Sequence, residues 1–196
     1  MKRKSIISRK TKETNIVISL NIDGNARRQI DTSVGFLNHM LDLFAKHGLF
    51  DLSVKAKGDI HIDDHHTVED IGIVLGEAFA KALGEKRGIK RYGFFILPME
   101  ESLATVAIDF AGRYSFQFNC TFVREKVGDL STELVSHFWN AFAQNAKANL
   151  HIKIENGMNE HHKIEGIFKA VARAIRMACE IDPRSKNEIP STKGKL

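Results

Sequence analysis

The pattern His-His-x-x-Glu occurs twice in this chain. Its two copies are His65, His66 and Glu69, and His161, His162 and Glu165. If each copy opens a helix, His65 and Glu69 lie one turn apart, so the carboxylate can reach an imidazole. Adjacent helical residues point about 100° apart, so the two imidazoles of a pair diverge. The two histidines of a pair are therefore better placed to bind two different metal ions than to bind the same one. Because the spacing repeats, it favours metal binding over solvated polar residues at a helix start.

One more histidine in each half lies on an earlier expected helix, at His39 and His137. The candidate metal ligands are thus His39, His65, His66, Glu69, His137, His161, His162 and Glu165. They divide into two sites of three histidines and one carboxylate, which leaves open positions for substrate on a six-coordinate metal. Ligand types alone leave zinc, iron, nickel and manganese open. The remaining histidines, His47, His61 and His151, show no matched pattern, which is typical of solvated or hydrogen-bonded residues.

The predicted strands and helices that position these residues also occur twice in the sequence. Alternating apolar residues predict strands at 13–24 and 101–112, and helical spacing predicts helices at 36–46 and 136–143. Further strands are expected at 52–56 and 150–154. The first is followed by a helix at 67–83, and the second by a helix that begins at the second His-His-x-x-Glu motif and ends at about residue 177. Residues 26–32 are interpreted as a hairpin partner of the first strand. We therefore predict a duplicated β-β-α-β-α unit.

The two predicted halves span residues of about 9–90 and 91–180. Units of this size bury too little surface to be independent, so we expect a single α+β domain over 1–196, an α/β sandwich with a pseudo-twofold. Residues 182–189 are typical of a polar linker, and we expect the tail at 182–196 to contribute to the site.

Composition narrows the class of protein. The 196 residues are 43% hydrophobic and 27% charged, which suits a globular chain with a real core. The net charge of +5 suggests either nucleic acid or a basic pocket for a phosphorylated metabolite, and no nucleic-acid motif is present in the sequence. The two cysteines, Cys120 and Cys179, form no CxxC, which is typical of reduced thiols. Without a signal-like or membrane-length apolar run, we expect a cytoplasmic protein.

Several motifs carry a family resemblance that covers essentially the whole chain. They lie at 9–14, 35–41, 64–70, 98–101, 112–113, 159–165 and 190–194. Together they resemble the imidazoleglycerol-phosphate dehydratase family. Three residues depart from the usual family pattern: Asn38 replaces aspartate beside His39, Glu100 is a longer acid, and Ala111 replaces serine. None of these changes removes a candidate ligand, but Asn38 can alter the surroundings of His39.

The resemblance implies a fold, an activity and an assembly. The fold is two four-stranded sheets enclosing the helices, and the activity is the dehydration of imidazoleglycerol phosphate to imidazoleacetol phosphate in histidine biosynthesis. The cofactors are two Mn²⁺ ions per subunit. Their ligands come from different subunits of trimers, which pack into a shell of about 24 chains. The substrate is a small phosphorylated imidazole, and neither nucleic acid nor a membrane is a partner.

The resemblance also assigns roles to residues. Two metal ions that grip the substrate's imidazole ring would help to expel its hydroxyl group, and a carboxylate must shuttle the protons. The implied catalytic residues are Glu13, as the proton shuttle, and Glu165. The candidate substrate- and phosphate-binding residues are Glu13, His39, His47, His65, Glu69, Arg91, Arg113, His161, Lys169, Ser191, Thr192 and Lys193.

Two other classes of protein could use a similar ligand set. A dinuclear metallohydrolase would use the metals to make hydroxide, but such sites are usually richer in aspartate, with a carboxylate bridging the metals. A metal-storage or metal-sensing protein could also use the eight ligands. It would have no need for Glu13 or the basic residues.

Overall fold

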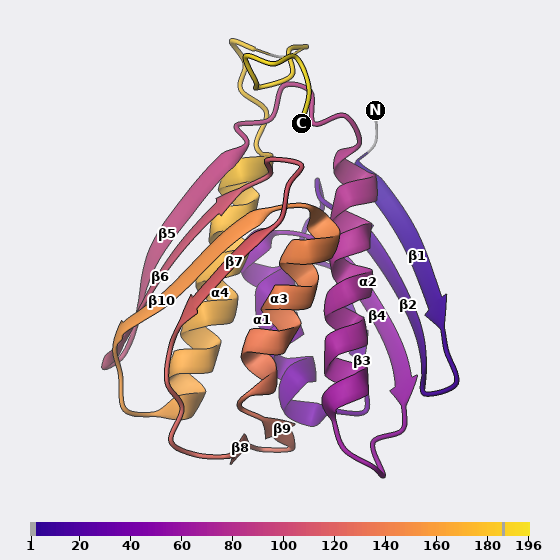
Figure 1. Ribbon diagram of the computed structural model, residues 1–196, viewed down its shortest axis with the longest axis vertical. Coiled ribbons are helices and arrows are strands. Elements are labelled where there is room, and N and C mark those ends of the chain that lie inside the picture. The colour runs from indigo at the N-terminus through magenta and orange to yellow at the C-terminus, as the bar shows by residue number, and fades with distance from the viewer. Residues whose placement is uncertain (1–2, 186) are drawn as a thin grey trace.

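Two four-stranded sheets lie on the outside of the molecule, and four helices fill the space between them (Figure 1). The structure, a computed structural model, describes residues 3–185 and 187–196. The first half contains β1 (Lys4–Lys10), β2 (Thr14–Asn21), β3 (Arg28–Asp31), α1 (Gly35–Gly48), β4 (Asp51–Gly58) and α2 (His65–Leu83). The second half contains β5 (Tyr92–Met99), β6 (Ser102–Asp109), β7 (Ser115–Asn119), β8 (Lys126–Val127), β9 (Leu130–Ser131), α3 (Leu134–Ala146), β10 (Asn149–Asn156) and α4 (Glu160–Cys179).

The two sheets have the same topology. Their strand orders are β1-β2-β4-β3 and β5-β6-β10-β7. In each sheet the last strand pairs in parallel with its neighbour, and the other pairs are antiparallel. The expected duplication and the two four-stranded sheets around the helices are confirmed. Each half is β-β-β-α-β-α, with one strand more than the spacing predicted, and the second half adds the small β8–β9 hairpin.

The additional strand of each half, β1 or β5, was not predicted. In β5 the outward-facing residues Tyr92, Phe94 and Ile96 are large and exposed, so the alternation that marks a half-buried strand is hidden. Strand β5 also contains Pro98, which is tolerated because β5 is an edge strand. The hairpin predicted between residues 26–32 and the first strand is wrong. Both edges of β2 are occupied by β1 and β4, so β3 pairs in parallel with β4 instead.

The core is shared between the halves. Strand β2 buries Ile16, Ile18 and Leu20 on the side that faces the helices, and its exposed residues alternate with them. Aromatic rings then connect the halves. Phe44 of α1 lies 5.9 Å from Trp139 of α3 between ring centroids, and these residues belong to one contiguous buried cluster. A half by itself would expose this cluster to water, which explains why the duplicated units fold together.

The helices pair across the two halves, α1 with α4 and α2 with α3. The tightest approach is at two glycines of α2. A Cβ atom at Gly72 would lie 2.5 Å from the carbonyl oxygen of Phe138, and one at Gly76 would lie 2.5 Å from that of Phe142. Since backbone atoms cannot yield as a flexible side chain can, only glycine allows α2 and α3 to pack this closely.

The C-terminal segment returns to the loop that precedes β5. The backbone N–H of Asp182 donates to Gly88, and the N–H of Gly88 donates to Glu188. Further along, the backbone of Leu196 lies against Gly112, where a Cβ would be 2.3 Å from the Leu196 carbonyl carbon. The expected polar linker at 182–189 is therefore attached to the body of the molecule.

Within residues 3–185 and 187–196, every helix is too short or too polar to cross a bilayer.

Replacing Gly72 by alanine should weaken the contact between α2 and α3. We expect Gly72→Ala to destabilise the protein by about 1–3 kcal/mol, because the methyl group overlaps a backbone carbonyl. Thermal or denaturant unfolding measures this change. The matched control is Gly166→Ala in α4, where the nearest atom to a new Cβ is 3.6 Å away. That variant should gain about 0.5–1 kcal/mol from helix propensity. Equal shifts for both variants would show that the α2–α3 contact is not tight.

Candidate metal centre

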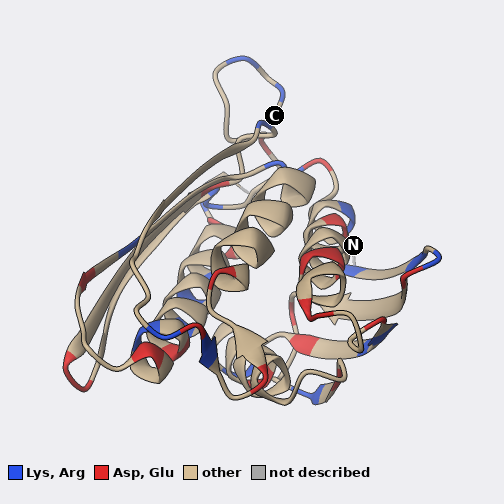
Figure 2. Ribbon diagram, turned by 60° about the horizontal axis from the view of Figure 1, so that its bottom comes forward, with Lys and Arg blue, Asp and Glu red and all other residues tan. Residues whose placement is uncertain are grey.

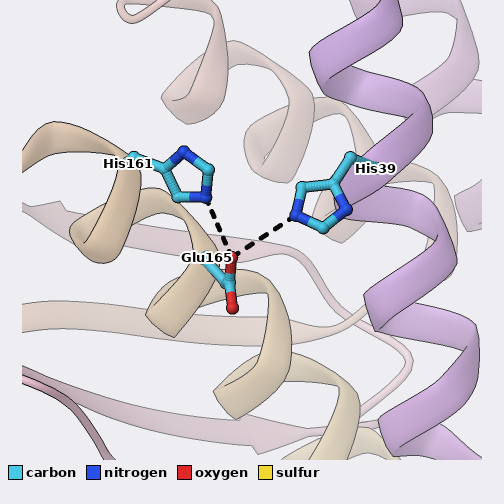
Figure 3. Close-up of side chains that lie close together, drawn as sticks. All are labelled: His39, His161 and Glu165. Atoms are coloured by element: carbon cyan, nitrogen blue, oxygen red, sulfur yellow. Dashed lines mark hydrogen bonds and ion pairs between the residues drawn. The ribbon is translucent and has the colours of Figure 1, made fainter.

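One group of possible ligands joins α1 to α4. Glu165 of α4 accepts a hydrogen bond from Nε2 of His161, one turn earlier, at 3.0 Å. Nε2 of His39 on α1 lies 3.5 Å from the same carboxylate oxygen (Figure 3). The two imidazoles are partly exposed, and the carboxylate is nearly buried. One carboxylate and two imidazoles therefore converge at the surface end of a helix pair.

The second group joins α2 to α3 and is the pseudosymmetric equivalent. Nε2 of His65 lies 4.0 Å from Glu69, one turn later on α2. The ring of His137 on α3 lies edge-on to His65, with 5.1 Å between centroids. One ligand atom from each residue of either group lies within 4.8 Å of the others in that group. Because each helix pair contains one helix from each half, neither half can build a group alone.

The second histidine of each pair points elsewhere. Nδ1 of His66 lies 3.1 Å from Asp59 and 3.9 Å from Glu13, and Nδ1 of His162 lies 2.8 Å from Glu101. Hydrogen bonding to Asp59 and to Glu101 raises the pKa of His66 and His162, respectively. The expected divergence of adjacent imidazoles is therefore observed. Within one chain, three of the four ligands expected for each site are brought together.

The glutamates beside these histidines occupy equivalent positions, yet their surroundings differ. Glu101 accepts hydrogen bonds from the backbone N–H groups of Asn159 and Met158 and from His162. The backbone bond from Asn159, followed by that of His162, lowers the pKa of Glu101 well below its usual range. Glu13, in contrast, is 55% exposed and 3.9 Å from His66. Glu101 is thus fixed in place as an anion, whereas Glu13 faces solvent beside an imidazole.

Sequence reasoning gave Glu101 no ligand role and did not mention Asp59. Glu100, Glu101 and His162 form a third group whose ligand atoms lie within 4.8 Å of one another. The only sequence feature that could have indicated these residues is their acidic side chain, since Asp59 directly follows β4 and Glu101 lies in the β5–β6 turn. In an alternating pattern such residues look like ordinary solvated strand ends.

A lysine and a histidine lie beside the first group. Nζ of Lys169 contacts Glu165 at 2.5 Å. Burial acts to raise the pKa of Glu165, but bonds from Lys169 and His161 outweigh it, so the pKa lies below its ordinary value. Burial, together with the charges of Lys169 and Arg173, lowers the pKa of His47. The group therefore holds an ionised carboxylate with a cationic side chain behind it.

Asn38, which replaces the usual aspartate before His39, anchors the start of α1. Its amide oxygen accepts a hydrogen bond from the backbone N–H of Thr32 at 2.9 Å and another from the Thr32 hydroxyl at 2.7 Å. The amide oxygen thus accepts two hydrogen bonds in the loop just before the helix that carries His39.

Most of the predicted phosphate-binding residues lie far from both groups. Arg91, Arg113, Ser191, Thr192 and Lys193 line a hollow of about 530 Å³ together with Lys195 and Leu196. This hollow adjoins the C-terminal end of α4, since the N–H of Arg91 donates to Ala178. His161 is the second residue of α4 and lies at its opposite end. Figure 1 shows that the C-terminal segment gathers at only one end of this helix. A helix rises about 1.5 Å per residue, so roughly 25 Å separates the two ends. A small substrate cannot reach from one to the other within a single chain.

Arg91 holds this hollow together. Its guanidinium donates to both carboxylate oxygens of Asp109, at 2.6 and 3.0 Å, and to the carbonyl oxygen of Pro190 at 2.9 Å. The hydrogen bond to Asp109 raises the pKa of Arg91, so the group stays charged. Lys193 and Lys195 line the hollow, and Figure 2 shows blue segments, which mark Lys and Arg, along the loop that leads to the C-terminus. The hollow is therefore suited to an anion.

The donor sets fit a divalent metal of intermediate hardness. Each helix-pair group offers two imidazoles and one carboxylate, a mixture that suits manganese as well as iron, nickel or zinc. The histidine and the glutamate of each group are spaced i, i+4, about one helical turn, so both donors lie on one face of the helix. The imidazoles are partly exposed, so additional ligands can approach from outside.

Comparison with known proteins gives a consistent result. The protein-family model for imidazoleglycerol-phosphate dehydratase matches residues 32–175. The chain is 56% identical over 194 residues to the imidazoleglycerol-phosphate dehydratase of Rhodopirellula baltica, covering 99% of this chain and 96% of that one. It is 54% identical over 194 residues to that of Methylorubrum populi, covering 99% and 100%.

Solved structures are similar over their full length. The crystal structure of imidazoleglycerol-phosphate dehydratase from Staphylococcus aureus has a TM-score of 0.80 at 42% identity, covering 91% of this chain and 100% of that one. The enzyme from Pyrococcus furiosus, in complex with (S)-C348, has a TM-score of 0.82 at 31% identity, covering 97% and 100%.

Loss of the Asp109 carboxylate should release the C-terminal segment. We expect Asp109→Asn to cost about 1–3 kcal/mol, because the largely buried Arg91 loses its anionic partner. Trypsin should then cleave faster after Lys193, as a timed digestion measures. The control is Glu180→Gln, which breaks the neighbouring Lys90 pair, where both side chains are nearly half exposed, and should cost less than about 1 kcal/mol. Identical digestion rates for all three proteins would contradict this role of Asp109.

Proposed function

This chain belongs to the imidazoleglycerol-phosphate dehydratase family, and we propose that two Mn²⁺ ions, held by its duplicated histidine and glutamate groups, support the family's reaction. The protein is a hydro-lyase of histidine biosynthesis that converts imidazoleglycerol phosphate to imidazoleacetol phosphate. The observation that carries the metal proposal is the equivalence of the two helix-pair groups. Each contains two imidazoles and one carboxylate, built from one helix of each half.

The first ion is assigned to His39, His161 and Glu165, and the second to His65, Glu69 and His137. When bound, the two ions act as Lewis acids and as a template for the substrate's imidazole ring. His66 and His162 point away from the groups of their own chain, so we assign each of them to a metal site completed by another copy. This arrangement gives every ion three histidines and one carboxylate.

Glu13 is assigned as the proton shuttle. The reaction removes a hydroxyl group from one carbon and a proton from its neighbour, so a carboxylate must move protons between them. Glu13 is exposed and lies beside His66, whereas its equivalent Glu101 is held by two backbone N–H groups. Glu165 is the second catalytic candidate, because its ionised carboxylate lies between a candidate metal site and Lys169.

The substrate is assigned to the space between copies of the chain. The C-terminal hollow is roughly 25 Å from His161 of its own chain, so we propose that a second copy supplies the phosphate contacts. The proposed substrate and phosphate contacts are Glu13, His39, His47, His65, Glu69, Arg91, Arg113, His161, Lys169, Ser191, Thr192 and Lys193. Arg91 orients the segment that carries Ser191 and Lys193 by donating to the Pro190 carbonyl. The tail at 182–196 thereby contributes to the site of a neighbouring chain.

An assembly of many copies follows from shared ligands. Because the three ligands within one chain leave each site incomplete, we propose that neighbouring copies share ligands. The resemblance to the family implies trimers that pack into a closed shell of about 24 chains, and we propose this assembly, in the cytoplasm, for this protein. Metal binding and assembly are then linked, since each stabilises the other.

The Mn²⁺ content of variants that each lack one ligand tests whether the two groups bind separate ions. We expect about two Mn²⁺ ions per chain in protein saturated with metal, and about one after either His39→Ala or His137→Ala, because each removes a ligand from one group only. Elemental analysis after removal of free metal measures this content. Chelation should abolish the dehydration of imidazoleglycerol phosphate, and added Mn²⁺ should restore it. A saturated content near one ion per chain would overturn the pairing of the groups.

Replacing Glu13 tests its role in proton transfer. Glu13→Gln keeps the size of the side chain and removes the proton carrier, so turnover should fall by roughly 10²–10⁴-fold. Metal content and the affinity for an inert triazole-phosphonate analogue should stay within about twofold of wild type. The matched control is Glu101→Gln at the equivalent position, which should lower stability by loosening Met158 and Asn159 and should affect turnover less. Near-normal turnover in Glu13→Gln would move the proton transfer to another group.

A further inference from the structure

The β8–β9 hairpin is an insertion that breaks the symmetry of the two halves. The connection from β3 to α1 is residues 32–34, whereas the equivalent connection from β7 to α3 is residues 120–133 and contains the hairpin. Val127 and Leu130 bury their side chains in the shared core, and Gly128 between them takes a positive φ of 60°. The hairpin is therefore a fixed part of the fold at the end where the histidines lie.

The tip of the hairpin caps the helix that carries His39. Asp129 accepts hydrogen bonds from the backbone N–H groups of Gly35, at 2.5 Å, and Phe36, at 2.8 Å. These are the first residues of α1, and the residue before them, Val34, has a side chain that cannot accept a hydrogen bond. The capping group comes from the other half of the chain. His39 lies one turn after Gly35, so the cap fixes the turn that directly precedes His39.

A second contact reaches the other histidine of the same group. The ring of Phe36 lies edge-on to His161, with 5.0 Å between centroids, and 6.4 Å from His39. A Cβ at Gly128 would lie 3.2 Å from the Cβ of Phe36, so the hairpin backbone packs directly on this side chain. Asp129 and Gly128 thus determine where Phe36 lies, and Phe36 limits the rotation of His161.

The hairpin is itself anchored to the fold. The backbone N–H and the hydroxyl of Ser131 donate to Asp64, at 2.7 and 2.8 Å. Asp64 is buried and directly precedes α2. Since the anchor is a different helix from the one that is capped, the hairpin holds α1 relative to α2 rather than moving with α1.

From these contacts we propose that the β8–β9 hairpin is a positioning element for the His39–His161–Glu165 group, acting through Asp129 and Phe36. It sets the directions of the two imidazoles before a metal ion binds. This role rests on the proposed function, because it takes the group to be a metal site. The second group lacks an equivalent cap from residues 32–34, which are too few to form a hairpin. The cap by Asp129 therefore acts on one of the two groups only.

The proposal is tested by measuring the Mn²⁺ affinity of each group separately, in variants where only that group is intact. His137→Ala leaves the His39 group intact, and His39→Ala leaves the His65 group intact. Adding Asp129→Ala to each, in the full-length protein, should weaken Mn²⁺ binding by about 10–100-fold in the His137→Ala background and by less than about twofold in the His39→Ala background. Isothermal titration calorimetry with Mn²⁺ reads both affinities without any need for activity. Asp129→Asn, whose amide oxygen can still accept a backbone hydrogen bond, should restore most of the affinity.

The matched control is Asp51, which accepts hydrogen bonds from the backbone N–H groups of Asn25 and Arg27 and lies at the start of β4, away from the histidines. Asp51→Ala should lower thermal stability without changing either affinity. If Asp129→Ala does not fold, Phe36→Leu, which removes the ring beside His161, should weaken the same group alone.

Equal weakening of both groups, or an unchanged affinity of the His39 group, would overturn the positioning role. If His39→Ala and His137→Ala each still bind two ions, the proposed metal groups fail instead. The two failures are therefore distinguishable.

Discussion

The close packing of helices across the two halves is the constraint on which the rest of this structure depends. Gly72 and Gly76 let α2 approach the backbone of α3, and α1 lies against α4 in the same relation. The His39–His161–Glu165 and His65–Glu69–His137 groups each contain one helix from each half, so the approach of the helices sets the distance between the imidazoles of each group. A displacement of about 1 Å between the helices would misplace the donors, and metal sites tolerate only a few tenths of an ångström. In this fold, the packing of the core therefore also determines the geometry of the candidate metal sites.

The two halves differ in what surrounds their equivalent glutamates. Glu13 and Glu101 begin equivalent strands, and the histidine beside each of them is equivalent too. The backbone of the shorter connection before α4 binds the Glu101 carboxylate, and the longer connection before α2 supplies Asp59 as a partner of His66 instead. A difference in two loops therefore turns one glutamate into a structural cap and leaves the other exposed to solvent.

Much of the fold and of the candidate site could be predicted from the sequence, because repetition supplied the evidence. The doubled His-His-x-x-Glu spacing predicted three residues of each helix-pair group when combined with His39 and His137, and the diverging imidazoles followed from helical geometry. The cross-half pairing of the helices and the 25 Å gap to the C-terminal hollow could not be predicted, since both depend on tertiary packing. Strand β5 was missed because Tyr92, Phe94 and Ile96 face outward. The contacts of Asp129 with α1 join residues more than ninety positions apart, beyond the reach of any local pattern.

The pairing of helices across the halves also bears on what one half could do by itself. A separate half would carry one helix of each pair and so only part of each group, His39 without Glu165 and His65 without His137. Two identical halves around a true twofold axis would rebuild both groups, but as exact copies with identical surroundings. When the halves are joined in one polypeptide, their sequences can differ, so the two groups can have different surroundings. This allows an aspartate that caps α1 alone and a solvent-exposed carboxylate at one strand end alone, which an assembly of identical pieces cannot specify.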